Sequence, residues 1–110
     1  MIKSLKKKIT YHRQEGFTDI PNNILDAIMT AKLTGTQISI CFHLMRYSYG
    51  NGQISAAISL HEFAVGCNSS RSYIHKQLKD LIARNIIIRL EKKPGQTSVY
   101  MMNYKVSEWA

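Results

Sequence analysis

Apolar side chains recur every three or four residues along the stretch 70–84, which is the spacing of one face of an α-helix. Ser70 stands at the start of this stretch, and its hydroxyl can accept a hydrogen bond from a first-turn N–H that has no partner within the helix. We therefore expect a helix over 70–84 that is anchored by one apolar stripe. The residues of that stripe are Ile74, Leu78, Leu81 and Ile82.

The side of this predicted helix opposite the stripe is cationic and rich in hydrogen-bond donors. Apart from Asp80, no acidic residue interrupts it. In most helices such a side is simply a solvated surface, so its meaning depends on the sequence around it. A helix of this kind can also lie in the major groove of DNA and contact base edges. The side chains in question are Arg71, Ser72, His75, Lys76 and Lys79.

Two longer helices are predicted nearer the N-terminus. The first covers about 22–33, and Thr34-Gly35 should end it, with Gly35 in the left-handed conformation of a helix cap. The second covers about 35–48 and is apolar on most sides, so we expect it to be the central, most buried helix. Its main stripe consists of Ile38, Cys41, Phe42 and Met45.

A short helix is predicted just before the cationic one. Ser59 can cap a helix over about 60–65, and Glu62 stands where a capping box needs it. A tight connection over 66–69 follows, in which Asn68 is well suited to positive φ. A short helix, a four-residue turn and a second helix with basic exposed positions are typical of a helix-turn-helix.

Strand-like residues follow the cationic helix. The segments 86–91 and 97–104 are rich in β-branched and aromatic residues, and Lys92-Lys93-Pro94-Gly95-Gln96 forms a turn between them. This pattern predicts an antiparallel hairpin, or wing, whose two lysines can reach a phosphate backbone; a short strand is also expected at 56–58. The predicted class is mainly α with a small β-hairpin (α+β), a winged helix-turn-helix over 16–110.

Net charge directs attention to a polyanionic partner. The chain of 110 residues suits one domain and has a formal charge of +8. Nucleic acid is the first candidate and an acidic membrane surface the second. Residues 1–15 form a basic arm that either lies along phosphates or in a minor groove of DNA, or serves only as a solubilising tail. Its cationic candidates for such contacts are Lys6, Lys7, Lys8 and Arg13.

Several classes of function find no support in the sequence. It has no apolar run long enough to span a bilayer, so we expect a cytoplasmic protein that does not bind membranes. Paired carboxylates, a glycine-rich phosphate loop and a nucleophile beside a base are all missing, which argues against an enzyme. Cys41 and Cys67 are expected to be free buried thiols, with one disulfide as the alternative. No metal or cofactor is expected.

With these elements placed, the sequence resembles the N-terminal, origin-binding domain of bacteriophage replication protein O. The resemblance covers about residues 16–109 and is most specific between Gly16 and Gly50. It rests there on the segments 16–29, 31–37 and 46–50. The matches at 58–60, 70–71 and 78–87 are weaker evidence, since many winged helices share them, and Glu108-Trp109 closes the match.

The resemblance implies a protein that binds repeated sites in a phage replication origin, often as a homodimer on inverted half-sites. Members of the family also recruit the host helicase through a separate C-terminal region. Residues 1–110 contain no such region, so helicase recruitment is not carried over, and a full-length protein and an excised domain both stay open. The first helix and residues 106–109 are the segments in which we would seek a dimer interface.

We therefore expect sequence-specific binding of double-stranded DNA during initiation of replication. A winged-helix transcriptional regulator of phage or plasmid origin and a winged helix that binds protein are the alternatives. Ser70 and Ser72, at the positive end of the helix, are expected to hold phosphates. Base edges are assigned to Arg71, His75 and Lys76, and the backbone to Tyr73, Lys79, Lys92 and Lys93.

Overall fold

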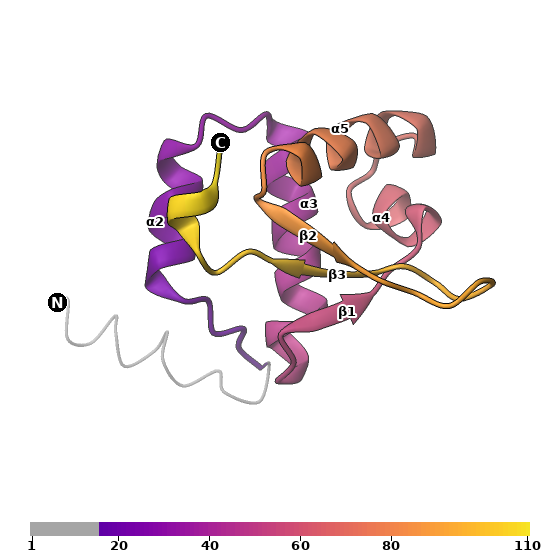
Figure 1. Cartoon of the computed structure of the whole chain (residues 1–110), viewed down its shortest axis with the longest axis horizontal. Coiled ribbons are helices and arrows are strands. Elements are labelled where there is room, and N and C mark those ends of the chain that lie inside the picture. The colour runs from indigo at the N-terminus through magenta and orange to yellow at the C-terminus, as the bar shows by residue number, and fades with distance from the viewer. Residues whose placement is uncertain (1–15) are drawn as a thin grey trace, which may run out of the picture.

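The computed structural model describes residues 16–110 as helices around a small sheet (Figure 1). A helix-turn-helix is followed directly by a β-hairpin, as the sequence predicts. In chain order the elements are α2 (Asn22–Thr30), α3 (Gly35–Tyr47), the 3-10 turn η2 (Tyr49–Asn51), β1 (Ser55–Ala57), α4 (Leu60–Gly66), α5 (Arg71–Ala83), β2 (Ile87–Leu90), β3 (Val99–Met102) and the 3-10 turn η3 (Val106–Glu108).

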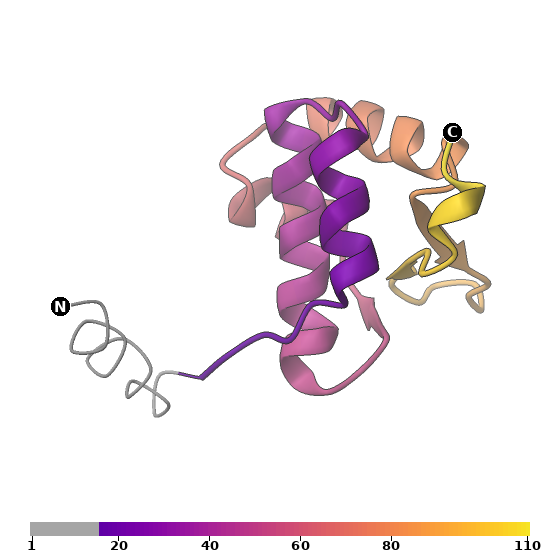
Figure 2. The same ribbon diagram turned by 90° about the vertical axis from the view of Figure 1, so that its left-hand side faces the viewer.

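The helix α3 is the centre of the core, as predicted. It runs alongside α2, and the sheet and the other helices pack around it (Figure 2). Its predicted stripe is partly wrong, because Phe42 is 47% exposed. The buried side of α3 is rotated toward α5 and β3, which contact it from that direction. The core residues that α3 contributes are Ile40, Cys41, Leu44 and Met45.

The boundary between α2 and α3 differs from the prediction. The first helix ends at Thr30, and Lys32, with φ 54°, takes the left-handed conformation expected at Gly35. The reason is a capping box: the Thr34 hydroxyl accepts from the backbone N–H of Gln37, and the Gln37 side chain accepts from the N–H of Thr34, both at 3.1 Å. Gly35 is therefore the first residue of α3, and the preceding helix has to end before it.

The helix-turn-helix forms where the sequence predicts it. The Ser59 hydroxyl accepts from the backbone N–H of Glu62, and the Glu62 carboxylate accepts from the backbone N–H of Ser59, both at 3.1 Å. The helix α4 therefore begins in a capping box. Asn68 adopts φ 51° in the turn. Ser70 caps α5 by accepting from the N–H of Tyr73 at 3.2 Å. Because both helices are capped, their first turns need no tertiary contact to satisfy those N–H groups.

Ser59→Ala should lower the free energy of unfolding by about 1 kcal/mol, because it removes a cap and half of the capping box. The same bonds lower the pKa of the Glu62 carboxyl. A carboxyl whose pKa is lowered in the folded state adds to the free energy of unfolding at pH values above its ordinary pKa. This contribution is lost as the pH falls through the lowered pKa. Urea unfolding at neutral and acidic pH measures both effects. Ser39→Ala, at an exposed position of α3, is the control and should lose nothing; equal losses in the two variants would contradict the cap's role.

The sheet is antiparallel with strand order β1-β3-β2. The hairpin aligns Arg89 with Tyr100 and Ile87 with Met102. The short strand β1 pairs with the other edge of β3, a pairing that its sequence did not indicate. Both hairpin strands are shorter than predicted, which leaves a longer wing loop over 91–98 between them.

The C-terminal residues close the fold on the side of α2. Asn103 is buried and donates to the carbonyl of Asn85 at 2.9 Å, and its own carbonyl accepts from the indole N–H of Trp109 at 2.9 Å. Arg84 donates to the carbonyl of Ala110 at 2.7 Å and to that of Ala31 at 2.8 Å. These bonds hold η3 near α2, and they engage Arg84, the C-cap residue of α5, in structural contacts.

Candidate nucleic-acid interface

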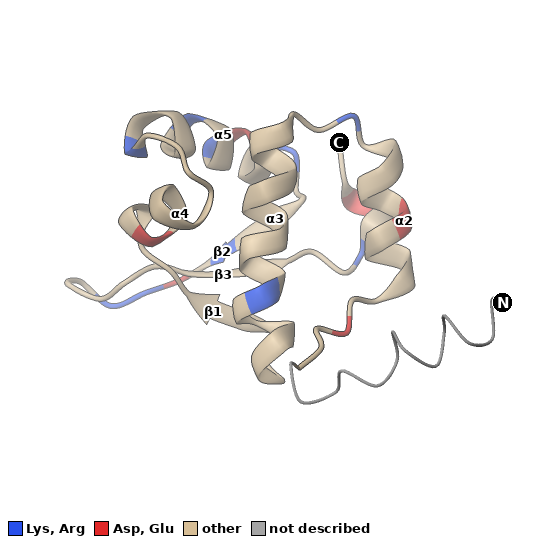
Figure 3. Ribbon diagram, turned by 180° about the vertical axis from the view of Figure 1, so that it is seen from behind, with Lys and Arg blue, Asp and Glu red and all other residues tan. Residues whose placement is uncertain are grey.

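The predicted cationic side of α5 is exposed along its length. Arg71, Ser72, His75, Lys76 and Lys79 all reach solvent, and Figure 3 shows basic positions along the helix. The one acidic residue of α5 is engaged elsewhere, because Asp80 accepts a 2.7 Å hydrogen bond from the side-chain amide of Gln37 on α3. This bond holds the Asp80 carboxylate toward α3, and the four basic or imidazole side chains of α5 outnumber it.

A groove of about 630 Å³ lies between α5 and the wing. Leu78, Ile82 and Tyr100 provide apolar wall, and cationic and imidazole side chains line it from both sides. None of the described residues that line it is acidic. The basic and imidazole residues of the groove are Arg71, His75, Lys79, Arg89 and Lys92.

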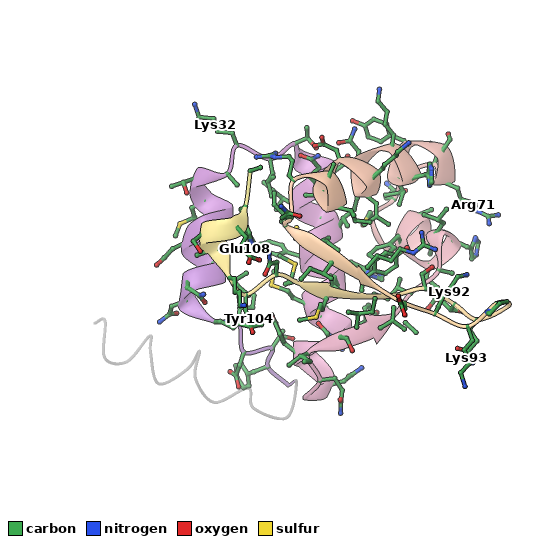
Figure 4. All side chains as sticks on the ribbon, viewed as in Figure 1. Lys32, Arg71, Lys92, Lys93, Tyr104 and Glu108 are labelled. Carbon is green, nitrogen blue, oxygen red and sulfur yellow. The ribbon has the colours of Figure 1, made fainter. Side chains whose placement is uncertain are left out.

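The structure separates the predicted contact residues into two groups. Arg71, His75 and Lys79 are four residues apart and share the edge of α5 that borders the groove. Ser72, Tyr73 and Lys76 are exposed but do not line the groove; on a helix their positions fall on its outer side. Figure 4 shows Arg71 projecting away from the rest of the fold at the N-terminal end of α5.

The two wing lysines also differ. The Lys92 ammonium donates to the carbonyl of Gln96 at 2.8 Å, which holds its side chain along the loop and at the rim of the groove. Lys93 projects outward from the wing, beyond the groove (Figure 4). A hydrogen-bonded cation loses less side-chain entropy on binding than a free one, so the two lysines are not equivalent contacts.

Ser70 and Ser72 lie where α5 begins. The Ser70 hydroxyl oxygen is occupied as the N-cap, and it lies 3.5 Å from the hydroxyl of Ser72. The positive end of the α5 dipole is exposed at this point. A helix N-terminus with two hydroxyl groups beside it favours a phosphate oxygen, and the role of Ser70 and Ser72 in holding phosphates stays a prediction.

Arg89 was not among the residues predicted from the sequence. It lies on β2, is exposed and lines the groove. Only the strand register shows where it points, since Arg89 aligns with Tyr100, which lines the same groove. In the sequence it is one polar residue within an apolar strand, and the only signal was that a charge interrupts this strand.

The basic arm cannot be placed. Lys6, Lys7, Lys8 and Arg13 lie outside the described residues. The described chain begins near η2, where a Cβ on Gly50 would come within 2.9 Å of the Thr18 hydroxyl oxygen. That end of the fold is remote from the tip of the wing (Figure 1).

A second hollow, of about 590 Å³, lies between α3, β1 and α4. His43 borders it, with its ring 4.7 Å from that of Tyr47 and 5.1 Å from that of Phe63. The Nδ1 atom of His43 is buried without a hydrogen-bond partner among the described residues. Burial lowers the pKa of this imidazole, although the Glu62 carboxylate opposes the shift. His43 therefore packs as a neutral imidazole between two aromatic rings, and this packing could not be predicted from the sequence.

Both cysteines are free thiols, as expected. Cys41 is buried and Cys67 half-buried. Burial, and secondarily the charge of Cys67, raises the pKa of Cys41 to about 12. Burial also raises the pKa of Cys67. Both groups are thus held as thiols near neutral pH, which makes them poor nucleophiles.

Comparison with known proteins agrees with the fold. Residues 11–109 match the family model described as bacteriophage replication protein O. The crystal structure of the adhesin competence repressor AdcR from Streptococcus pyogenes is similar, with a TM-score of 0.52 and 19% identity over 93% of this chain. This chain spans 64% of the length of that one. The winged helix-turn-helix fold is thereby confirmed.

A comparison with curated protein sequences found no match. Within residues 16–110, no helix is long and apolar enough to cross a membrane.

Proposed function

The chain belongs to the bacteriophage replication protein O family, and on that premise we propose that it binds double-stranded DNA at repeated sites of a phage-type replication origin. The observation that carries the proposal is the groove between α5 and the wing, which five basic or imidazole side chains line and no acidic one. Because its cationic side chains come from both α5 and the wing, such a groove attracts the phosphates of a DNA strand that lies in it. Residues 16–110 are then the DNA-binding unit and residues 1–15 a basic arm that adds phosphate contacts.

The proposed mode of binding places α5 in the major groove. Its N-terminal turns present Arg71, His75 and Lys76 to base edges, and an arginine can give two hydrogen bonds to guanine. The wing then lies over the neighbouring backbone. Residues proposed to contact phosphates are Ser70, Ser72, Tyr73, Lys79, Lys92 and Lys93, and from the arm Lys6, Lys7, Lys8 and Arg13.

Arg71→Ala should weaken binding to the preferred site by about 1–3 kcal/mol and reduce discrimination against other sequences. Arg71 projects freely from the first turn of α5, so its removal leaves the core unchanged. Fluorescence anisotropy titrations with an origin-region duplex and with a scrambled duplex of equal length measure both quantities.

Lys93→Ala is the matched comparison, because Lys93 is also exposed but projects from the wing tip. It should weaken binding to both duplexes alike, as the loss of a phosphate contact does. Equal losses on the two duplexes in the Arg71 variant would remove the base-reading role from this residue.

Repeated and inverted half-sites would be read by two copies of the chain. The helix α2 lies on the opposite side of the fold from the wing and α4 (Figure 1), and it carries the exposed apolar side chains Leu25 and Met29, so a dimer through α2 would leave both cationic surfaces free. A two-to-one protein-to-duplex ratio on an inverted repeat supports the dimer. A repressor would use the same surface at a promoter, so the location of the bound site in the genome distinguishes the two roles.

A further inference from the structure

An arginine occupies the inner face of the sheet, where the residue two positions earlier is core. Ile87 and Arg89 share one face of β2, because side chains alternate along a strand. Ile87 is 1% exposed, whereas Arg89 is exposed and lines the groove. Its cross-strand neighbour Tyr100 is buried and packs edge-on against Phe63 on α4, so this face is the one that covers the helices. At Arg89 the inner face of the sheet leaves the core and becomes part of the lining of the groove.

The guanidinium of Arg89 has no acceptor within the part of the chain that the structure describes. No hydrogen bond or ion pair to any residue of 16–110 involves it. Two ammonium groups flank the same groove, Lys79 from α5 and Lys92 from the wing. An exposed guanidinium without an acceptor, in a groove that two ammonium groups and no acidic side chain line, favours the entry of an anion.

We propose that this groove holds the phosphodiester backbone of one DNA strand and that Arg89 is its anchor. This inference rests on the proposed DNA binding, and it adds which residues of the surface contact the DNA backbone and which face the bases. The part of the groove lined by Lys79, Arg89 and Lys92 takes the backbone, whereas Arg71 and His75, nearer the N-terminal end of α5, and Lys76 on its outer side face the bases. A planar guanidinium can donate two parallel hydrogen bonds to one phosphate, which a lysine cannot do.

A phosphate contact from Arg89 would fix how deeply α5 enters the major groove. Phosphate contacts position a protein on the duplex but carry no sequence information. Arg89 is on a strand paired to β3, so its backbone is fixed relative to α5 through the core, whereas Lys93 is on a loop. A contact from a rigid strand sets register; a contact from a loop tip mainly adds charge.

The test compares Arg89→Ala, Arg89→Lys and Arg46→Ala in the full chain. Arg46 is an exposed arginine on α3 that stacks over Tyr47 and does not line the groove, so it controls for loss of one positive charge. Anisotropy titrations use an origin-region duplex and a scrambled duplex at several salt concentrations. Thermal unfolding by circular dichroism verifies that each variant is folded.

Arg89→Ala should weaken binding about tenfold on both duplexes and lower the salt slope by about one, as loss of a phosphate contact does. Arg89→Lys should restore the slope but only part of the affinity, because the second hydrogen bond is missing. Arg46→Ala should change affinity much less. A loss confined to the origin duplex, or a loss equal to that of Arg46→Ala, overturns the anchor. If the unaltered chain binds neither duplex, the proposed function itself fails.

Discussion

Phe63→Ala should lower the free energy of unfolding by about 3–5 kcal/mol, the usual cost of truncating a fully buried phenylalanine. Phe63 is the residue through which α4 joins the core: it is 0% exposed, and its ring lies 5.1 Å from that of His43 on α3 and 5.8 Å from that of Tyr100 on β3. A cavity here detaches the first helix of the helix-turn-helix from both. Since small domains have about 5–15 kcal/mol of stability, this loss would be a large fraction of it.

Val65→Ala is the control for Phe63→Ala, because it is on the same helix but is 68% exposed. It should change stability by no more than about 0.5 kcal/mol, as surface substitutions usually do. Urea unfolding followed by circular dichroism measures both variants. Similar midpoints for the two would mean that α4 is not held to the core through Phe63.

Gly66→Ala should destabilise the fold by about 1–3 kcal/mol, although alanine is the better helix former. Gly66 is the last residue of α4, and a Cβ there would overlap the imidazole of His43. That ring is held between the rings of Tyr47 and Phe63, so moving it disturbs the packing of α3 against α4. The overlap outweighs the gain in propensity, which is about 1 kcal/mol at most.

Two further variants test this explanation. Gly35→Ala is the control, because a Cβ at Gly35 meets nothing within 4 Å; it should be neutral or slightly stabilising. The second is Gly66→Ala in a His43→Ala background, where the overlap is gone. There the added methyl should cost nothing, and the double-mutant cycle should show a coupling of about 1 kcal/mol or more. Equal costs of Gly66→Ala in both backgrounds would show that His43 is not the obstacle.

The helix-turn-helix and the wing could be predicted from the sequence because their signals are local. Ser59 and Ser70 are caps next to apolar stripes, and Asn68 is a residue that tolerates positive φ. Each depends on residues no more than four positions away. The end of α2 was misplaced, since Thr34-Gly35 suits both a helix end and a helix start, and the bond to Gln37 decides for the start.

The features that could not be predicted depend on contacts far apart in the sequence. The groove depends on the alignment of β2 with β3 beside α5, and this register puts Arg89 in the same groove as Lys79. The pairing of β1 with β3 joins residues more than forty positions apart. The close approach of Gly66 on α4 to His43 on α3, which leaves no room for a Cβ, also joins residues distant in the sequence. Periodicity gives the face of one element but not the neighbour that covers it.

The central claim is that the winged helix recognises origin DNA through α5 and the groove beside it. The most direct test is fluorescence anisotropy of the purified chain against origin-region fragments and scrambled fragments from the same genome, at low and at higher salt. The account predicts tight binding to a repeated origin sequence that survives the higher salt, while binding to scrambled fragments falls steeply. Equal, salt-sensitive binding to every fragment would contradict it and would leave a basic winged helix whose specific partner is something else.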